Sequence, residues 1–161
     1  MKSYNGFTPY QRQQHHDWLK AAIKMGVVPE PKVCAACSQE RGKIEYHAED
    51  YNWRFTPGIA LCYRCHTVVH LRDRYPEFWD AYRGAVREGC RFEPANNFNE
   101  VLQHARNGNL DFAYFDVVEF SLLRANTVLD DIQDGRLKPA VINKPPRNWR
   151  QLIESELGRK P

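Results

Sequence analysis

The chain has 161 residues, of which 42% are hydrophobic and 12% are aromatic, and its formal net charge is only +3. Such a composition excludes global disorder and fits one domain, or one small domain with helical additions. The first residues contain no apolar segment of the kind found in secretory signals, and no stretch approaches the length of a membrane span. We therefore expect a soluble protein of the cytoplasm.

The charges are distributed unevenly along the chain. Residues 1–33 carry five Lys or Arg against two Asp or Glu, and residues 136–161 carry seven against two. Residues 75–135 carry five basic side chains against eleven acidic ones, and residues 34–74 are nearly balanced at six against five. The basic ends favour contact with phosphates, and the acidic middle favours a protein partner. Ordinary solvated faces explain both distributions equally well.

A helix is predicted to begin at Thr8 and Pro9, where the threonine supplies an N-cap and the proline fits the first helical position. Apolar residues then recur at helical spacing from Trp18 to Ile23. Gly26 is expected to end this helix, and a Pro-Glu-Pro connector follows it.

The segment from residue 34 to residue 74 contains only short predicted elements, separated by turns. Strands are predicted over residues 43–47 and 59–61, with a Pro-Gly turn before the second. A short helix is predicted over residues 65–71. The order of elements in this segment is therefore strand, strand, helix.

The rest of the chain is predicted to be mostly helical. Helices are expected over residues 76–87, 97–107, 111–134 and 149–157. The first three are each followed by a glycine that suits a helix end, namely Gly89, Gly108 and Gly135. The proline-containing stretch 137–146 is expected to be an extended linker.

The predicted fold class is α+β and mostly helical, with a zinc-stabilised ββα module followed by a helical C-terminal region. Four segments are predicted: an N-terminal helix and lead (1–33), the zinc-binding module (34–74), an acidic helical region (75–135), and a basic linker with a C-terminal helix (136–161).

Four of the five cysteines form two CxxC pairs, which are Cys34, Cys37, Cys62 and Cys65. In a reducing compartment this pattern indicates a metal site rather than disulfides. Each pair presents two thiolates from one tight turn, and two such turns complete the tetrahedral shell of a structural zinc ion. A ligand set in which His66 or His70 replaces one cysteine is the alternative. The fifth cysteine, Cys90, is expected to be a buried core residue.

Three histidines lie close to this pattern. His66 and His70 are four residues apart on a predicted helix, so they share a face, and His66 points about 100° away from the preceding cysteine. His47 ends the preceding strand and is followed by Glu49 and Asp50. We expect these groups to converge on a second metal site, where a divalent ion could polarise a phosphodiester. The alternative is that the histidines are surface groups or partners of the zinc ligands.

These motifs resemble those of the HNH (ββα-metal) endonuclease family, and most of all its small zinc-containing members common in bacteriophages and prophages. The resemblance rests on the first CxxC pair, on Tyr46-His47-Ala48-Glu49-Asp50-Tyr51, and on Leu61-Cys62-x2-Cys65-His66-x3-His70. It covers roughly residues 15–90. It implies a protein of phage or mobile-element origin that works in the cytoplasm of a bacterial host.

The resemblance also implies residue roles. The three histidines would hold Mg²⁺, Mn²⁺ or a second Zn²⁺, and His47, Glu49 and Asp50 take the catalytic positions. The second histidine of the family pair, which acts as general base, falls at Ala48, and alanine cannot accept a proton. Glu49 or Asp50 would then have to activate the water, and cleavage is expected to be weak or absent.

Three functions are consistent with these features. The first is a zinc-stabilised, HNH-like protein that binds DNA with weak or absent nuclease activity. The second is an active, metal-dependent nicking endonuclease, and the third is a modulator that binds a host protein through the acidic helical region. The basic side chains expected to contact nucleic acid are Lys43, Arg54, Arg64, Arg72 and Arg74, with Trp53 and Phe55 interleaved among them.

Overall fold

The computed structural model describes residues 3–51, 57–111, 113–115, 127–137, 151 and 154–155, and only the backbone of residues 113–115. The chain divides into two compact units. The first comprises residues 1–30, 48–58 and 138–161, and the second comprises residues 31–47 and 59–137. The described residues form five helices and two small antiparallel sheets, which confirms the predicted α+β class. Within those residues, no helix is long and apolar enough to cross a membrane.

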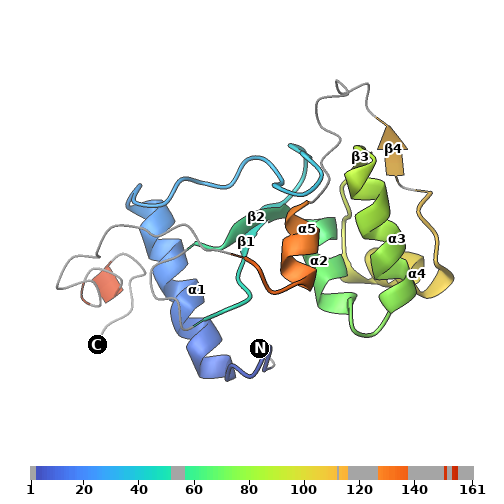
Figure 1. The fold of residues 1–161 in the computed structure, drawn as a ribbon. Helices are drawn as coiled ribbons and strands as arrows, with labels where there is room; N and C mark the ends of the chain where they lie inside the picture. Colours follow the sequence, from blue (N-terminus) through green and yellow to red (C-terminus); the bar gives the residue numbers. More distant parts are fainter. Residues whose placement is uncertain are drawn as a thin grey trace. The chain divides into compact units, whose positions relative to one another are not determined.

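The first unit is built on helix α1, Pro9–Lys24 (Figure 1). Its N-cap is Thr8, whose hydroxyl accepts a hydrogen bond from the Gln11 amide while the Gln11 side chain accepts one from the Thr8 amide. Gly26 follows the helix at a φ of 72°, a left-handed value that favours glycine. The predicted helix is confirmed, and its buried residues are Trp18, Leu19, Ala21 and Ala22.

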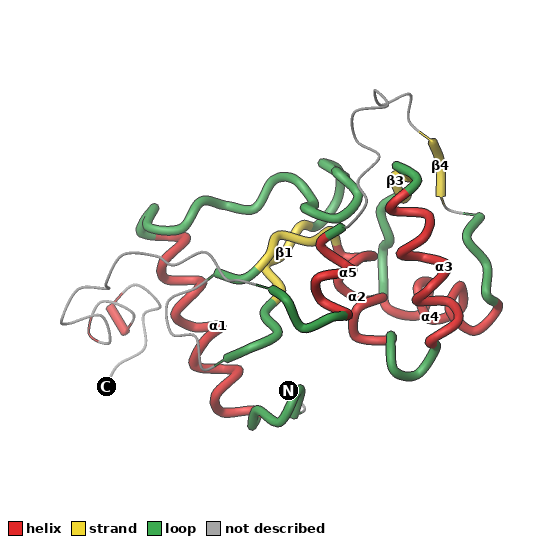
Figure 2. The backbone as a smooth tube through the Cα atoms, viewed as in Figure 1, coloured by secondary structure: helices red, strands yellow, loops and turns green. Residues whose placement is uncertain are grey.

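The second unit contains a two-stranded hairpin followed directly by a helix (Figure 2). Strand β1, Ile44–His47, pairs antiparallel with β2, Ile59–Cys62, so that Ile44 lies opposite Cys62. Helix α2, Tyr63–Leu71, begins at the next residue with Cys62 as its N-cap. All three elements lie within two residues of the ranges expected from the sequence.

Two further helices pack against α2. Helix α3 is Pro76–Arg87, and helix α4 is Phe98–Asn107. The side chain of Asn97 caps α4 by accepting a hydrogen bond from the Glu100 amide, and Gly108 ends it at a φ of 62°. Both helices confirm the sequence-based expectation.

The sequence predicts one helix over residues 111–134 after α4, and this prediction is wrong. Ala113–Phe115 forms strand β4, which pairs antiparallel with β3, Cys90–Phe92. Helix α5 covers only Val128–Gln133, and its N-cap Thr127 is extended. Short apolar runs fit a strand as well as a helix, so pairing with β3 decides the outcome here. The segment 116–126, the linker 138–146 and most of the predicted last helix lie outside the described residues.

One buried cluster connects the hairpin and helices of the second unit. It contains the four cysteines of the CxxC pairs together with apolar side chains from α2, α3, β3, α4 and α5. Cys90 is part of this cluster, which confirms its predicted place in the core. The segment that carries the CxxC pairs therefore shares its core with the helices that follow it. The predicted division into four segments stays a prediction.

Arg64 on α2 is also buried, with 1% of its surface exposed. Its Nε donates a hydrogen bond of 2.7 Å to the Glu93 carbonyl oxygen, and its Nη2 forms an ion pair with Glu100 of α4. These contacts join α2 to α4 and to the segment before it. The sequence predicts that Arg64 contacts nucleic acid, whereas in the structure its guanidinium is buried and engaged with Glu93 and Glu100.

We expect Arg64→Ala to lower the free energy of unfolding by about 3 kcal/mol, since it leaves a cavity and removes the donors to Glu93 and Glu100. Chemical denaturation measures this loss. Arg72→Ala is the matched control on the same helix, because Arg72 is only half-buried and donates to the Val69 carbonyl oxygen. The control should lose less than about 1 kcal/mol, and equal losses would contradict the assignment.

Candidate metal centres

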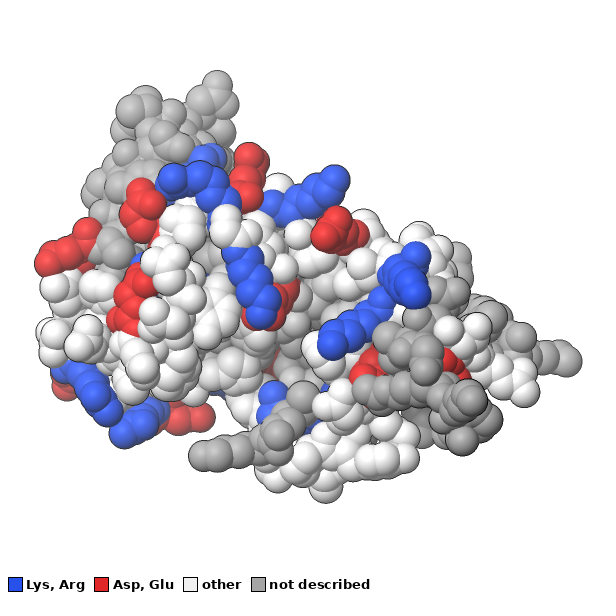
Figure 3. All heavy atoms as spheres, turned by 180° about the vertical axis from the view of Figure 1, so that it is seen from behind, with Lys and Arg blue, Asp and Glu red and all other residues white. Residues whose placement is uncertain are grey.

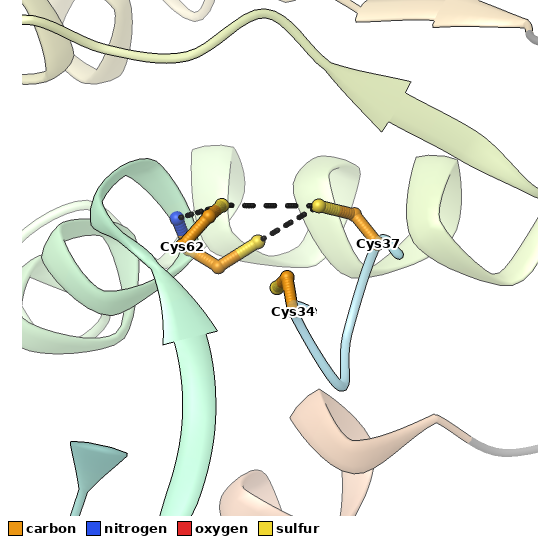
Figure 4. Close-up of side chains that lie close together, drawn as sticks. Cys34, Cys37 and Cys62 are labelled. Atoms are coloured by element: carbon orange, nitrogen blue, oxygen red, sulfur yellow. Dashed lines mark hydrogen bonds between the residues drawn. The ribbon is translucent and has the colours of Figure 1, made fainter. Parts of the chain in front are cut away.

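The first candidate centre is the cluster of Cys34, Cys37, Cys62 and Cys65, whose sulfur atoms all lie within 4.8 Å of one another. Cys34 and Cys37 flank a tight turn, in which the Ser38 amide donates to the Cys34 carbonyl oxygen at 2.9 Å. Cys62 ends β2, and Cys65 lies in the first turn of α2. Figure 4 shows the sulfurs of Cys34, Cys37 and Cys62 turned toward one another.

The separations of these sulfurs fit zinc. Four sulfurs bound at about 2.3 Å to one zinc ion in a tetrahedron stand about 3.8 Å apart. The sulfur of Cys37 lies 3.8 Å from that of Cys62 and 3.6 Å from that of Cys65, and none of the described cysteines forms a disulfide. The four thiols are at most 4% exposed. This donor set, buried and at these distances, is consistent with a structural metal such as zinc.

The electrostatics of the cluster also favour a cation. Hydrogen bonds from the other three thiols hold the pKa of Cys34 well below its usual value, whereas burial raises the pKa of Cys65. Burial, followed by the negative charge of nearby cysteine thiolates, likewise raises the pKa of Tyr82 well above its usual value, so this phenol keeps its proton. A buried thiolate is costly unless a positive charge compensates it. Zinc would supply that charge.

The second candidate centre is formed by His47, His66 and His70. One nitrogen of each ring lies within 4.8 Å of the others. The ring centroids are 5.0 Å apart for His47 and His66, 5.2 Å for His47 and His70, and 4.9 Å for His66 and His70. His47 is 1% exposed at the end of β1, and the other two lie one turn apart on α2. The structure thus brings together the three imidazoles that the sequence singles out.

Glu45 joins this centre, although the sequence did not single it out. It lies two residues before His47 on β1, so both side chains face the same side of the hairpin. Its carboxylate lies 3.2 Å from Nδ1 of His66 and forms an ion pair with Lys43. The hydrogen bond with His66, followed by that with Lys43, lowers the pKa of Glu45 to about 2.

This contact orients the ring of His66. The anionic carboxylate can only accept a hydrogen bond, so the proton of His66 lies on Nδ1. The lone pair then lies on Nε2, which is 3.1 Å from Nε2 of His70. A carboxylate that fixes the tautomer of a histidine in this way is typical of metal centres. The histidines and Glu45 therefore fit a divalent ion.

Glu49 and Asp50 belong to the first unit, and Glu49 makes contacts there. Its carboxylate accepts hydrogen bonds from the Tyr4 hydroxyl at 2.7 Å and from the Asn5 side chain at 2.8 Å. The guanidinium of Arg12 lies over the rings of Tyr4 and Tyr51, 5.2 and 5.4 Å from their centroids. Glu49 therefore helps to hold the N-terminal turn against the segment after β1. Among the described residues, neither Glu49 nor Asp50 belongs to the four-cysteine cluster or to the group of three histidines.

The residues expected to bind nucleic acid differ in their surroundings. Lys43 is exposed and paired with Glu45, and Arg74 is exposed with its guanidinium 5.4 Å from the ring centroid of Tyr75. Arg54, like Trp53 and Phe55, lies outside the described residues. On the face drawn in Figure 3, basic and acidic side chains are interspersed. Of the predicted set, Lys43, Arg72 and Arg74 thus keep surface that a ligand could contact.

Comparison with known proteins gives no relative for this chain. No family model matches it, and neither a curated protein nor a solved structure matches it.

We expect Cys62→Ser to abolish tight zinc binding and to lower the melting temperature, because a serine hydroxyl does not replace a thiolate ligand and the binding energy of a structural zinc is folding energy. Zinc content per chain and thermal unfolding followed by circular dichroism measure both effects. Cys90→Ser is the matched control, because Cys90 is buried but is not one of the four gathered thiols, and this variant should keep one zinc per chain. A metal-free wild-type chain that melts as cooperatively as the zinc-loaded one would contradict this account.

Proposed function

We propose that this chain is a zinc-stabilised, HNH-like nucleic-acid-binding protein whose histidine centre holds a divalent ion, and whose cleavage of nucleic acid is weak. The observation that carries the proposal is the convergence of His47, His66 and His70 on one hairpin and helix, which also carry two of the four clustered cysteines, Cys62 and Cys65. Helix α2 carries ligands of both candidate centres. Cys62 and Cys65 would fix the start of α2, and that helix would in turn fix His66 and His70.

The proposed ion is Mg²⁺, Mn²⁺ or a second Zn²⁺, which when bound would polarise a phosphodiester and stabilise its leaving oxygen. His47 is buried and so offers a rigid ligand, whereas His70 is exposed and offers the side open to a ligand from solvent. Glu45 would keep the proton of His66 on Nδ1. Lys43, which forms an ion pair with Glu45, would contact a phosphate near the ion.

Weak cleavage follows from the side chain at position 48. Ala48 directly follows the buried His47 and is itself 8% exposed. Because residue 48 is an alanine, it offers no imidazole to accept a proton from water. Glu49, the nearest acidic residue in sequence, is engaged with Tyr4 and Asn5. Loss of a general base costs about 10²–10⁴-fold in rate. Binding without efficient cleavage is therefore the function these residues support best.

A protein-binding role for the acidic helical region finds less support. Asp80 and Asp130 pair with Arg83, and Asp130 also pairs with Arg87. Asp131 and Asp134 pair with Arg136. These ion pairs use acidic groups within the second unit rather than leaving them to a partner. The excess of acidic residues in this region is therefore partly explained by internal contacts.

The proposal predicts that Ala48→His raises plasmid nicking by about 10²–10⁴-fold over the wild type in Mn²⁺, because it supplies an imidazole at the position of the missing base. Conversion of supercoiled plasmid to open circles measures the rate. Ala48→Gln is the matched control, since glutamine adds similar bulk and no base. Thermal melts of both variants establish that they fold.

Two results would contradict the proposal. The first is a folded Ala48→His variant that nicks no faster than Ala48→Gln. The second concerns binding of duplex DNA in the presence of Mn²⁺, measured by fluorescence anisotropy. The proposal fails if the affinity of the wild type does not change with salt, or if His70→Ala binds as tightly as the wild type. The exposed His16 on α1 provides the control substitution, His16→Ala.

Glu45→Gln is expected to weaken Mn²⁺ binding by about 10–100-fold, because the amide no longer fixes the tautomer of His66. The paramagnetic resonance signal of free Mn²⁺, titrated with zinc-loaded protein, measures the affinity. Glu40→Gln is the control, since Glu40 is an exposed carboxylate outside the candidate ligand groups. Equal affinities of the wild type and Glu45→Gln would show that the carboxylate does not orient the ligand.

A further inference from the structure

A phenol hydroxyl from outside the CxxC segment reaches the cysteine cluster. Tyr82 lies on α3, and its hydroxyl oxygen is 3.2 Å from the sulfur of Cys65. Both residues are 0% exposed. The CxxC pairs alone give no sign of this contact, because Tyr82 is 17 positions further along the chain than Cys65.

The ring of Tyr82 is held firmly in this position. It stacks on Phe92 of β3 with the centroids 4.2 Å apart and the ring planes 20° from parallel. Phe78, one turn earlier on α3, packs against it at 5.9 Å. These contacts leave the ring little freedom to swing, so the direction of its hydroxyl toward Cys65 is a property of the folded unit.

We propose that Tyr82 is a positioning residue of the zinc centre, whose hydroxyl donates a hydrogen bond to the metal-bound thiolate of Cys65 and thereby slows loss of the metal. A cysteine that binds zinc does so as the thiolate, which carries no proton. Between a thiolate and a phenol, only the phenol can donate. The direction of the hydrogen bond is therefore fixed once the metal is bound.

Such a hydrogen bond has two consequences. It spreads the negative charge of the sulfur, which makes the thiolate a weaker nucleophile toward alkylating agents and protons. It also ties α3 to the metal, because the donor sits on that helix and the acceptor on α2. The sulfur of Cys62 has a different donor, the Cys65 amide at 3.5 Å, so it does not compete for the Tyr82 hydroxyl.

This inference depends on zinc in the cysteine cluster and is independent of the proposed nucleic-acid function. A chain that nicks no plasmid under any condition leaves it intact. A chain that purifies without zinc, and takes up none, overturns it.

The test is Tyr82→Phe, which removes one oxygen atom and keeps the stacked ring. Tyr75→Phe is the matched control, since Tyr75 is the N-cap of the same helix and its hydroxyl faces Arg106. Transfer of zinc to a chromophoric chelator gives the release rate, and Co²⁺-substituted protein gives the sulfur-to-metal charge-transfer bands. We expect Tyr82→Phe to release zinc roughly 10–100-fold faster and to shift those bands.

Tyr75→Phe should match the wild type in both measurements. A general loss of packing in Tyr82→Phe would also speed zinc release. It would not shift the sulfur-to-cobalt charge-transfer bands in spectra recorded at low temperature. Release rates within twofold of the wild type, with an unchanged cobalt spectrum, would overturn the proposal.

A second measurement needs no variant. In wild-type protein loaded with ¹¹³Cd, the Tyr82 hydroxyl proton should exchange slowly with solvent and show scalar coupling to the metal through the hydrogen bond. The absence of any hydroxyl proton coupled to ¹¹³Cd would overturn the proposal even if Tyr82→Phe failed to fold.

Discussion

The second unit depends on one constraint, the gathering of four buried sulfurs from two tight turns. Cys34 and Cys37 come from a segment with little regular structure, whereas Cys62 and Cys65 sit where β2 passes into α2. Buried thiols at tetrahedral separations gain little from contact with each other, and a bound cation would turn the cluster into a strong link. The position of α2, and of everything packed on it, would then follow from the metal.

The two candidate centres use different faces of the same short helix, α2. Cys65 and His66 are neighbours in sequence, yet the sulfur turns into the core and the imidazole turns toward His47 and Glu45. The first centre would support the second: sulfur ligands would fix the start of α2, which carries His66 directly after Cys65 and His70 one turn further on. The core that encloses the sulfurs also includes α3 and α4, so these helices support the centre from outside the CxxC segment.

The sequence predicted correctly those parts of the fold that depend on contacts between residues close together in the chain. The CxxC spacing, the i, i+4 spacing of His66 and His70, and the caps of α1 and α4 all act within one turn, and each is found in the structure.

The errors lie where distant residues decide the outcome. The sequence presents Arg64 as a surface cation, whereas its partners Glu93 and Glu100, 29 and 36 residues further along the chain, hold it in the core. Ala113–Phe115 became a strand because Cys90–Phe92 pairs with it. Glu45 gained its role from a helix residue 21 positions later. Register and burial of this kind arise from tertiary contacts, which residue spacing does not encode.

The most direct test of this account is zinc K-edge X-ray absorption on the purified full chain, combined with elemental analysis of the same sample. The account predicts one tightly held zinc per chain with a shell of four sulfurs at about 2.3 Å. A shell containing nitrogen or oxygen ligands, or a folded chain without zinc, would contradict it.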